Sequence, residues 1–306
     1  MTATTAKIDF PFGVKEGATI SPATKRKERP SALIFTRALL FASLSLLTLL
    51  ITTAGCGKDP AMRLFSEAEV QLSRGEYIEA ITTHTRVLKK YPDTELAPQS
   101  LFKIAHIYYH YLDNIKMAMK TYDELAFLYP ESATLMDAAM ERGEIYSTLG
   151  KHWKAVEEYE WLLTNGAPKE NNRYQYLIAM EYFKMNDFKQ ARIEFAEIKD
   201  TDNEAGLAPE ILFRIATSYY LEKNLTKSLE AYKEVIRKFP KDKLAFQSSI
   251  NIAQVYSDAG RLKEAKELLT KLKTDSDTKE NDLIDIRIAL IEERIKNPTR
   301  RTKRKK

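Results

Sequence analysis

The chain has 306 residues, 44% of them hydrophobic and 30% charged, so it can bury a core in one large domain or two ordinary ones. Its 10 glycines and 11 prolines are too few for a collagen-like, low-complexity or turn-rich all-β protein, and its single cysteine excludes an intramolecular disulfide and a multi-cysteine zinc site. The net charge of +5 arises at the two ends, because residues 56–296 carry 35 Lys and Arg against 40 Asp and Glu, and this balance argues against a nucleic-acid partner.

The first 55 residues predict a secretory signal peptide rather than part of the fold. A basic cluster precedes the uncharged stretch 38–51, ALLFASLSLLTLLI, which is short for a membrane-spanning helix but fits the hydrophobic region of a signal. Small residues then lead to Cys56, and this Ala-Gly-Cys ending resembles the lipobox of bacterial lipoproteins, although Thr53 stands where leucine is usual. An uncleaved anchor helix and a buried free cysteine are the alternatives.

The lipobox resemblance implies cleavage before Cys56 and a covalent lipid on its thiol, with no other cofactor expected. Residues 56–60 are then a lipidated N-terminus and linker, held in the membrane by more than one acyl chain. Gly57 in place of aspartate implies, by analogy with sorting in enteric bacteria, the periplasm-facing leaflet of the outer membrane. The long segment before the hydrophobic region leaves the translation start open.

The remainder of the chain repeats one unit about six times. Small residues recur at intervals of 36–38 residues, and a second series follows each of them by 12 or 13 residues. The first series is Ala68, Ala105, Gly143, Ala179, Ala216 and Ala253, and the second is Ala80, Ala118, Ala155, Ala191, Ser228 and Ala265. A small residue lets two helices cross at about 8–9 Å, so each unit is predicted to be a helix hairpin.

The fifth unit shows the predicted helices most clearly. Residues 209–222 and 225–239 both place apolar side chains at helical spacing, with the polar turn Lys223-Asn224 between them. Pro240 ends the second helix, as Pro92 and Pro130 do in earlier units. One extra residue near Asp113 predicts a longer turn in the second unit.

Aromatic residues follow both series of small residues. Tyrosines stand three residues after the first series in five units, and mostly large side chains stand four residues after the second. The latter set is His84, Tyr122, Tyr159, Phe195, Tyr232 and Leu269. Aromatic stripes at helical spacing are typical of core packing, and we predict that role here.

The order small, aromatic, small, aromatic, proline, as in Ala216, Tyr219, Ser228, Tyr232 and Pro240, resembles the tetratricopeptide repeat (TPR). The resemblance implies an all-α fold: an α-solenoid of about six TPR-like hairpins over residues 61–296, with a C-terminal capping helix around residues 288–293. It also implies that the first helix of each hairpin lines a concave face.

The TPR resemblance implies a partner-binding groove formed by positions around the first small residue. These positions are Phe102, His106, Tyr109, Met140, Glu144, Tyr176, Met180, Phe183, Phe213, Thr217 and Tyr220. Aromatic and methionine side chains are enriched at interface cores, which favours an extended peptide or envelope protein as partner and no small-molecule substrate. The alternative is that an adjacent loop or the superhelix itself covers them.

No catalytic motif occurs in the sequence, and we expect no enzyme activity. His106 and His110 lie four residues apart, but Ile107 stands where a zinc protease has its glutamate, so the pair is typical of a surface or adventitious site and no metal site is predicted. A convergent polar pocket would be the sign of an enzyme.

The basic tail, residues 297–306, reads NPTRRTKRKK and is either a solvated tail or a segment attracted to anionic lipid head groups. A lipid anchor followed by TPR units resembles the BamD-type lipoproteins, which serve outer-membrane β-barrel assembly. The resemblance implies a scaffold for envelope proteins in that process, although the unit number exceeds the usual five. The alternative is a TPR adaptor lipoprotein for cell-wall synthesis and division or for secretion and pilus machinery.

Overall fold

The computed structural model describes residues 59–198, 207–275 and 278–297. The predicted signal peptide 1–55, Cys56 and the basic tail beyond Asn297 lie outside these residues. Within the described ranges no helix is both long enough and apolar enough to cross a bilayer.

The described residues form α-helices joined by short turns, with no strand among them. The helices are α2 (Pro60–Ser73), α3 (Tyr77–Lys90), α4 (Leu96–His110), α5 (Ile115–Leu128), α6 (Leu135–Thr148), α7 (His152–Asn165), α8 (Asn171–Lys184), α9 (Phe188–Ala196), α10 (Ala208–Leu221), α11 (Leu225–Lys238), α12 (Lys243–Asp258), α13 (Leu262–Asp275) and α14 (Thr278–Lys296). A short 3-10 helix, η1 (Pro168–Glu170), precedes α8. The predicted all-α fold is confirmed.

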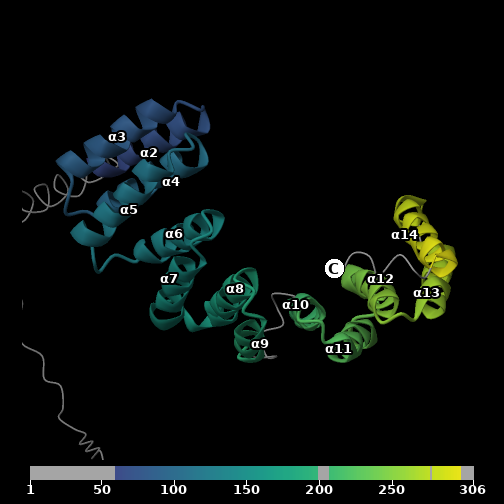
Figure 1. Cartoon of the computed structure of the whole chain (residues 1–306). Coiled ribbons are helices and arrows are strands. Elements are labelled where there is room, and N and C mark those ends of the chain that lie inside the picture. The colour runs from purple at the N-terminus through teal and green to yellow at the C-terminus, as the bar shows by residue number, and fades with distance from the viewer. Residues whose placement is uncertain (1–58, 199–206, 276–277, 298–306) are drawn as a thin grey trace, which may run out of the picture. The chain divides into compact units, whose positions relative to one another are not determined.

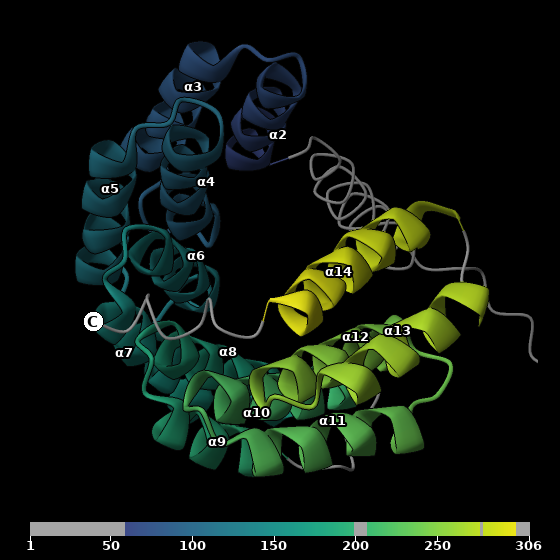
Figure 2. The same ribbon diagram turned by 45° about the vertical axis from the view of Figure 1, so that its right-hand side comes forward.

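Each odd-numbered helix from α3 to α13 packs against the helix before it, which makes six hairpins (Figure 1). Successive hairpins pack in chain order, and α14 packs against α13 after the sixth hairpin (Figure 2). The fold is therefore a TPR-like solenoid of stacked helix hairpins. The hairpin count and the C-terminal helix agree with the prediction, although α9 has only 9 residues where most helices have 14.

Both series of small residues are buried, because they lie where the two helices of a hairpin cross. Ala105 and Ala118, for example, are fully inaccessible and belong to one cluster with Tyr122. Gly143 takes the crossing position of the third hairpin, and a Cβ atom there would lie 2.4 Å from Cε1 of Tyr159. The third hairpin thus needs glycine where the other hairpins accept alanine.

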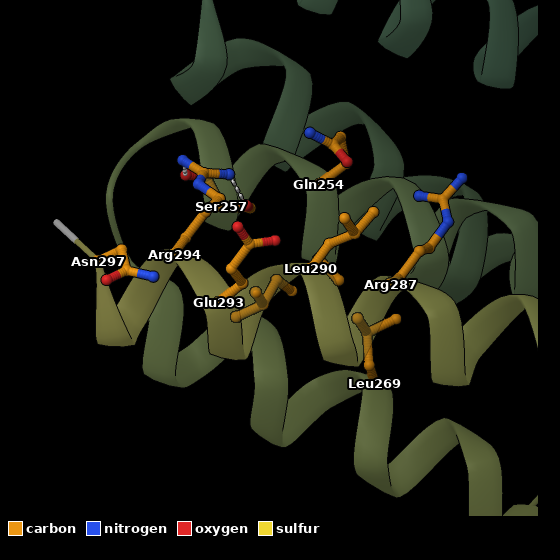
Figure 3. Close-up of a pocket in the computed structure, with 10 residues that line it drawn as sticks. Gln254, Ser257, Leu269, Arg287, Leu290, Glu293, Arg294 and Asn297 are labelled. Atoms are coloured by element: carbon orange, nitrogen blue, oxygen red, sulfur yellow. Dashed lines mark hydrogen bonds between the residues drawn. The ribbon is translucent and has the colours of Figure 1, made fainter. Parts of the chain in front are cut away.

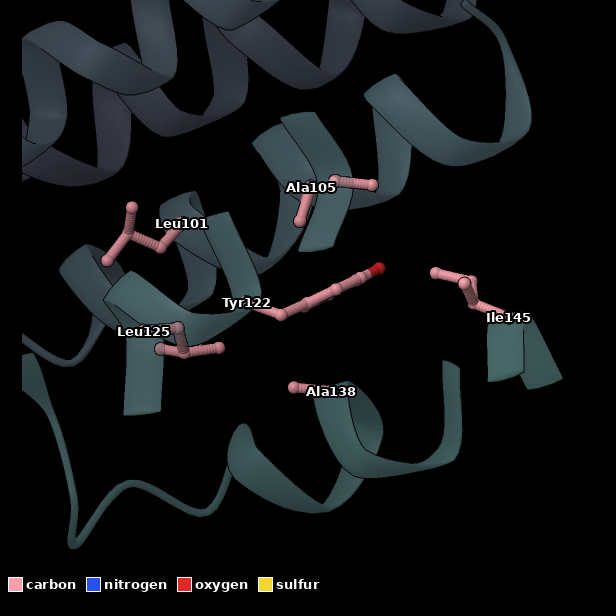
Figure 4. Packing of buried hydrophobic residues seen from close by; sticks show 7 residues of the cluster. Leu101, Ala105, Tyr122, Leu125, Ala138 and Ile145 are labelled. Carbon is pink, nitrogen blue, oxygen red and sulfur yellow. The ribbon is translucent and has the colours of Figure 1, made fainter. Parts of the chain in front are cut away.

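The large side chains predicted to pack between hairpins are buried in the core. Figure 4 shows the ring of Tyr122, on α5, between Leu101 and Ala105 of α4 and Ala138 and Ile145 of α6. Tyr159 and Tyr232 are buried at the equivalent positions of later hairpins. The series that follows the second small residues is core, as predicted, whereas the tyrosines three residues after the first small residues are half-buried.

The turn inside every hairpin contains one residue in the left-handed region of φ. These residues are Gly75, Asp113, Gly150, Asn186, Lys223 and Gly260. The turn around Asp113 has four residues between α4 and α5, against three in the other hairpins, which confirms the predicted extra residue. Glycine adopts positive φ at little cost, so Gly75, Gly150 and Gly260 suit this position and Lys223 does not.

Candidate partner-binding site

The predicted groove residues all lie on the first helices of hairpins two to five. Phe102, His106 and Tyr109 lie on α4; Met140 and Glu144 lie on α6; Tyr176, Met180 and Phe183 lie on α8; and Phe213, Thr217 and Tyr220 lie on α10. All are half-buried except Glu144, which is exposed. Their partial burial leaves each side chain with one surface in the core and another facing solvent.

In the described part of the chain, three of these residues come together at one cavity. Phe102, Met140 and Glu144 line a cavity of about 530 Å³ between α4, α6 and the start of α8. Its other lining residues are His110, Met136, Asp137, Glu141, Glu170, Arg173 and Tyr174. The cavity lining therefore combines apolar side chains with carboxylates.

The predicted residues on α8 and α10 pack elsewhere. Tyr176, Met180 and Phe183 contact the cluster around Phe195. On α10, Thr217 shares a hydrogen bond of 2.9 Å with the hydroxyl of Tyr232. These side chains are largely occupied by contacts within the protein.

Tyr220 is also held by a neighbouring hairpin. Its hydroxyl donates to Oδ2 of Asp258 on α12 at 2.6 Å. Burial, together with this carboxylate, raises the pKa of Tyr220 to about 12. Tyr220 and Asp258, which are about one repeat apart in the sequence, therefore meet across adjacent hairpins. Residues of adjacent hairpins also meet at the cavity.

Glu141 is the functional candidate that the sequence analysis missed. Nδ1 of His106 lies 2.6 Å from Oε1 of Glu141, Nε2 of His110 lies 3.4 Å from Oε2, and the buried Tyr122 hydroxyl donates to Oε2. Glu141 follows His106 by 35 residues, three fewer than the step from Ala105 to Gly143, so the repeat pattern does not place the two residues opposite each other.

The carboxyl group of Glu141 is ionised despite its partial burial. Burial opposes the charge, yet the hydrogen bonds with His106 and Tyr122 outweigh it and lower the pKa of Glu141. Conversely, loss of solvation and the charge of Glu141 raise the pKa of Asp137. With Glu144 and Glu170 added, the cavity is predominantly negative, and Arg173 is the cation in its lining.

A comparable glutamate lies one hairpin later. Glu181 on α8 is 1% exposed and accepts from Ser147 at 2.9 Å, contacts Nδ1 of His152 at 2.8 Å and pairs with Lys184 at 2.7 Å. Here a lysine ammonium neutralises the carboxylate, and one histidine contacts it. Glu181 thus forms an ion pair within α8, and its contacts with Ser147 and His152 link α8 to α6 and α7.

A larger cavity of about 770 Å³ lies between α12, α13 and α14 (Figure 3). Arg294 crosses it and donates both to the hydroxyl of Ser257 and, at 2.9 Å, to the Ser257 carbonyl oxygen. Leu269 and Leu290 form part of its apolar wall. None of the predicted groove residues lines this cavity, and its hydrogen bonds fasten the capping helix to the last hairpin.

Two segments of the chain match family models described as tetratricopeptide repeat: residues 210–242 and residues 246–274. No curated protein matches the sequence. Among solved structures, the chain is similar to a tetratricopeptide repeat protein from Parabacteroides merdae, with 18% identity and a TM-score of 0.54 over 76% of this chain and 86% of that chain. This likeness supports the fold.

Two further similar structures are pilus proteins. One is pilF of Pseudomonas aeruginosa, with 15% identity and a TM-score of 0.45 over 74% of this chain and 97% of that one. The other is PilW, a widely conserved type IV pilus biogenesis factor, with 15% identity and a TM-score of 0.48 over 74% and 99%. At these TM-scores neither indicates what this chain does.

Proposed function

We propose that this chain, a tetratricopeptide-repeat protein by its matched repeats and its fold, binds an extended, positively charged segment of a partner protein in the cavity between α4, α6 and α8. The TPR fold is an interaction scaffold rather than a catalytic one. Within that scaffold, the cavity between α4, α6 and α8 is the surface that binds, and positive charge is the property that it selects.

The composition of the cavity is the observation that supports this proposal. Phe102, Met136 and Met140 offer apolar side chains of the kind that anchor a partner's side chain. The same lining contains four carboxylates, from Asp137, Glu141, Glu144 and Glu170. A partner segment that alternates apolar with lysine or arginine side chains fits both features.

We further propose that the scaffold is attached to the outer membrane of a bacterium through a lipid on Cys56 and faces the periplasm. The lipobox resemblance at the end of residues 38–56 supports this location. Attachment there makes outer-membrane β-barrel assembly the first candidate process, since repeat lengths near 37 residues resemble the BamD-type lipoproteins. Adaptor roles in cell-wall synthesis, division, secretion or pilus assembly remain the alternative.

A photo-cross-linking amino acid at position 140 tests the binding surface. Met140 lies in the cavity, whereas the exposed Trp153, on α7 of the same hairpin, provides the control position. After irradiation of intact cells, we expect position 140, but not position 153, to capture an envelope protein identified by mass spectrometry. Equal capture at both positions, or none at position 140, contradicts the proposed surface.

The identity of the captured protein decides the process. A large barrel-assembly protein supports the assembly role, whereas pilus, secretion or cell-wall proteins contradict it and favour the adaptor alternative. Location is tested separately by fatty-acid labelling and density fractionation of wild type and Cys56→Ala. Loss of label and of outer-membrane sedimentation is expected for the variant, and an unlabelled wild type contradicts the anchor.

Charge reversal tests the selectivity of the cavity. Asp137→Lys with Glu144→Lys is expected to weaken partner capture by about ten-fold at low salt, with a smaller effect at high salt. Glu157→Lys with Glu160→Lys makes the same charge change at exposed positions of α7 and should leave capture unchanged. Equal losses in both double variants would show that net charge, rather than this cavity, selects the partner.

A further inference from the structure

Among the described residues, one group of three side chains with metal-ligating atoms stands out: His106, His110 and Glu141, whose ligand atoms all lie within 4.8 Å of one another. We propose that these three side chains bind one divalent transition metal ion, with Zn²⁺ as the first candidate. From the sequence no metal site is predicted, because Ile107 stands where a zinc protease has its glutamate and a bare histidine pair is typical of a surface.

The two histidines are placed by the geometry of α4. Residues four apart lie on the same face of an α-helix, one turn from each other, and this spacing is used by helical zinc sites. The ring centroids of His106 and His110 are 4.3 Å apart. Both rings therefore present nitrogens to the same side of the helix.

The third ligand comes from the next hairpin. Glu141 on α6 places one carboxylate oxygen 2.6 Å from Nδ1 of His106 and the other 3.4 Å from Nε2 of His110. Ligand atoms of a tetrahedral zinc ion at bond lengths near 2.0–2.1 Å are about 3.4 Å apart. Small side-chain rotations that widen the first contact would place a metal ion among the three groups.

The donor set matches the chemistry of zinc. Two imidazoles and one carboxylate are the three protein ligands of many zinc sites that keep a fourth position open for water or another ligand. The same ligands also suit other divalent transition metals, because a site of this kind binds several of them with affinities that follow a general order. Calcium and magnesium prefer sites built from oxygen alone.

The surroundings of the three side chains favour a cation. The side chains of His106, His110 and Glu141 are 28%, 39% and 13% exposed, so an ion can reach them from solvent. The hydroxyl of the buried Tyr122 donates to the Glu141 carboxylate, which is the second-layer support that holds a carboxylate ligand in place. Neighbouring carboxylates in the cavity lining add negative charge.

The Glu181 cluster in the next hairpin provides a matched control within the chain. His152 contacts Glu181 at 2.8 Å, much as His106 contacts Glu141, but residue 156, one turn further, is valine rather than histidine. Lys184 also pairs with Glu181 and opposes a bound cation. A histidine–glutamate pair therefore occurs in both clusters. The second histidine, His110, distinguishes the proposed site from the Glu181 cluster.

Isothermal titration of the full-length chain with Zn²⁺ tests the proposal, in a Cys56→Ser background because a thiol also binds zinc. A tag without histidine is needed, since the chain has only 4 histidines of its own. We expect one ion per chain, with affinity lowered at least about ten-fold by His110→Ala, His106→Ala or Glu141→Gln. His152→Ala should leave the affinity unchanged.

Titration with Co²⁺ supplies a readout that does not depend on stability. Bound Co²⁺ should show visible absorption bands of imidazole coordination, and these bands should disappear in His110→Ala, whose side chain is the most exposed of the three. Circular dichroism checks that each variant remains helical. Absence of stoichiometric binding by the wild type, or equal binding by wild type and His110→Ala, overturns the proposal.

Discussion

Two pairs of hairpins, α4–α7 and α10–α13, both bury a tyrosine in their core, but the hydroxyl groups of the two tyrosines have different hydrogen-bond partners. In the first hairpin of each pair, the second helix carries a buried tyrosine. This residue is Tyr122 on α5 and Tyr232 on α11. The hydroxyl of Tyr232 shares a hydrogen bond of 2.9 Å with Thr217, a neutral group on the preceding helix. The hydroxyl of Tyr122 instead donates to Glu141, a carboxylate on the following hairpin.

The C-terminal pair coincides with the two matched repeats, residues 210–242 and 246–274. The N-terminal pair forms the same kind of hairpin without such a match, and it places the acidic cavity and the histidine pair along its first helices. In both pairs, the small residues at the helix crossings and the buried tyrosines maintain the fold. The polar residues directly beside the crossing positions, such as His106 next to Ala105 and Glu144 next to Gly143, keep part of their surface accessible.

The largest difference between the two regions is expected at the crossing position. Gly143→Ala would place a Cβ against the ring of Tyr159, and this overpacking should lower the free energy of unfolding by up to about 3 kcal/mol. Alanine is already present at the equivalent Ala216. Urea unfolding followed by circular dichroism measures the change.

Replacing the ring tests the cause of that loss. The double variant Gly143→Ala/Tyr159→Leu should be destabilised by less than the sum of its single variants, because leucine removes the ring atom that the Cβ meets. Strictly additive losses would show that Gly143 is required for a reason other than contact with Tyr159.

Between pH 7 and pH 5, the N-terminal region should lose stability through His84. His84 is fully buried on α3, and this burial, opposed by the charge of Glu69, lowers its pKa to about 4. The unfolded chain takes up a proton near pH 6.5 and the folded chain only near pH 4, so stability from this residue falls as pH drops below 6.5. The loss at pH 5 is about 2 kcal/mol.

Hydrogen exchange of α3 amides at pH 7 and pH 5, corrected for the intrinsic effect of pH, measures this loss. His84→Leu removes the titrating group and should show a smaller pH effect, whereas His152→Ala, at a half-buried histidine on α7, should not. The same pH effect in wild type and His84→Leu would assign it to other groups.

Removing the hydroxyl groups of Tyr122 and Tyr232 should lower the free energy of unfolding by different but smaller amounts in the two regions. Tyr122→Phe removes a hydrogen bond to a carboxylate and should cost about 2 kcal/mol, whereas Tyr232→Phe removes a bond to a hydroxyl and should cost about 1 kcal/mol. Equal values from urea unfolding would remove the energetic distinction between the charged and the neutral partner.

The smallest expected effect concerns the turn between α10 and α11. Lys223 has a φ of 65°, where the equivalent Gly150 and Gly260 have φ of 70° and 82°. Lys223→Gly should therefore raise the melting temperature slightly, by relief of about 1 kcal/mol of backbone strain. The same change at Lys227, inside α11, should lower it, and stabilisation at both positions would contradict the explanation.

The sequence by itself determined the repeating hairpin. Helix geometry acts over a few residues and therefore leaves a local pattern in the sequence. The pattern consists of small residues such as Ala105 and Ala118, an aromatic residue four positions after the second of them, and a closing proline. These features predicted six hairpins, the longer turn near Asp113 and the burial of Tyr122. Three of the predicted groove residues, Phe102, Met140 and Glu144, line the candidate cavity.

Only the tertiary structure decided which polar residues of different hairpins meet. Glu141 lies 35 positions after His106, and nothing local to either helix indicates that their side chains are 2.6 Å apart. That contact depends on how one hairpin packs on the next, which side-chain volumes across the whole interface determine. For the same reason Tyr220 pairs with Asp258, while Glu144 remains exposed at the rim of the cavity.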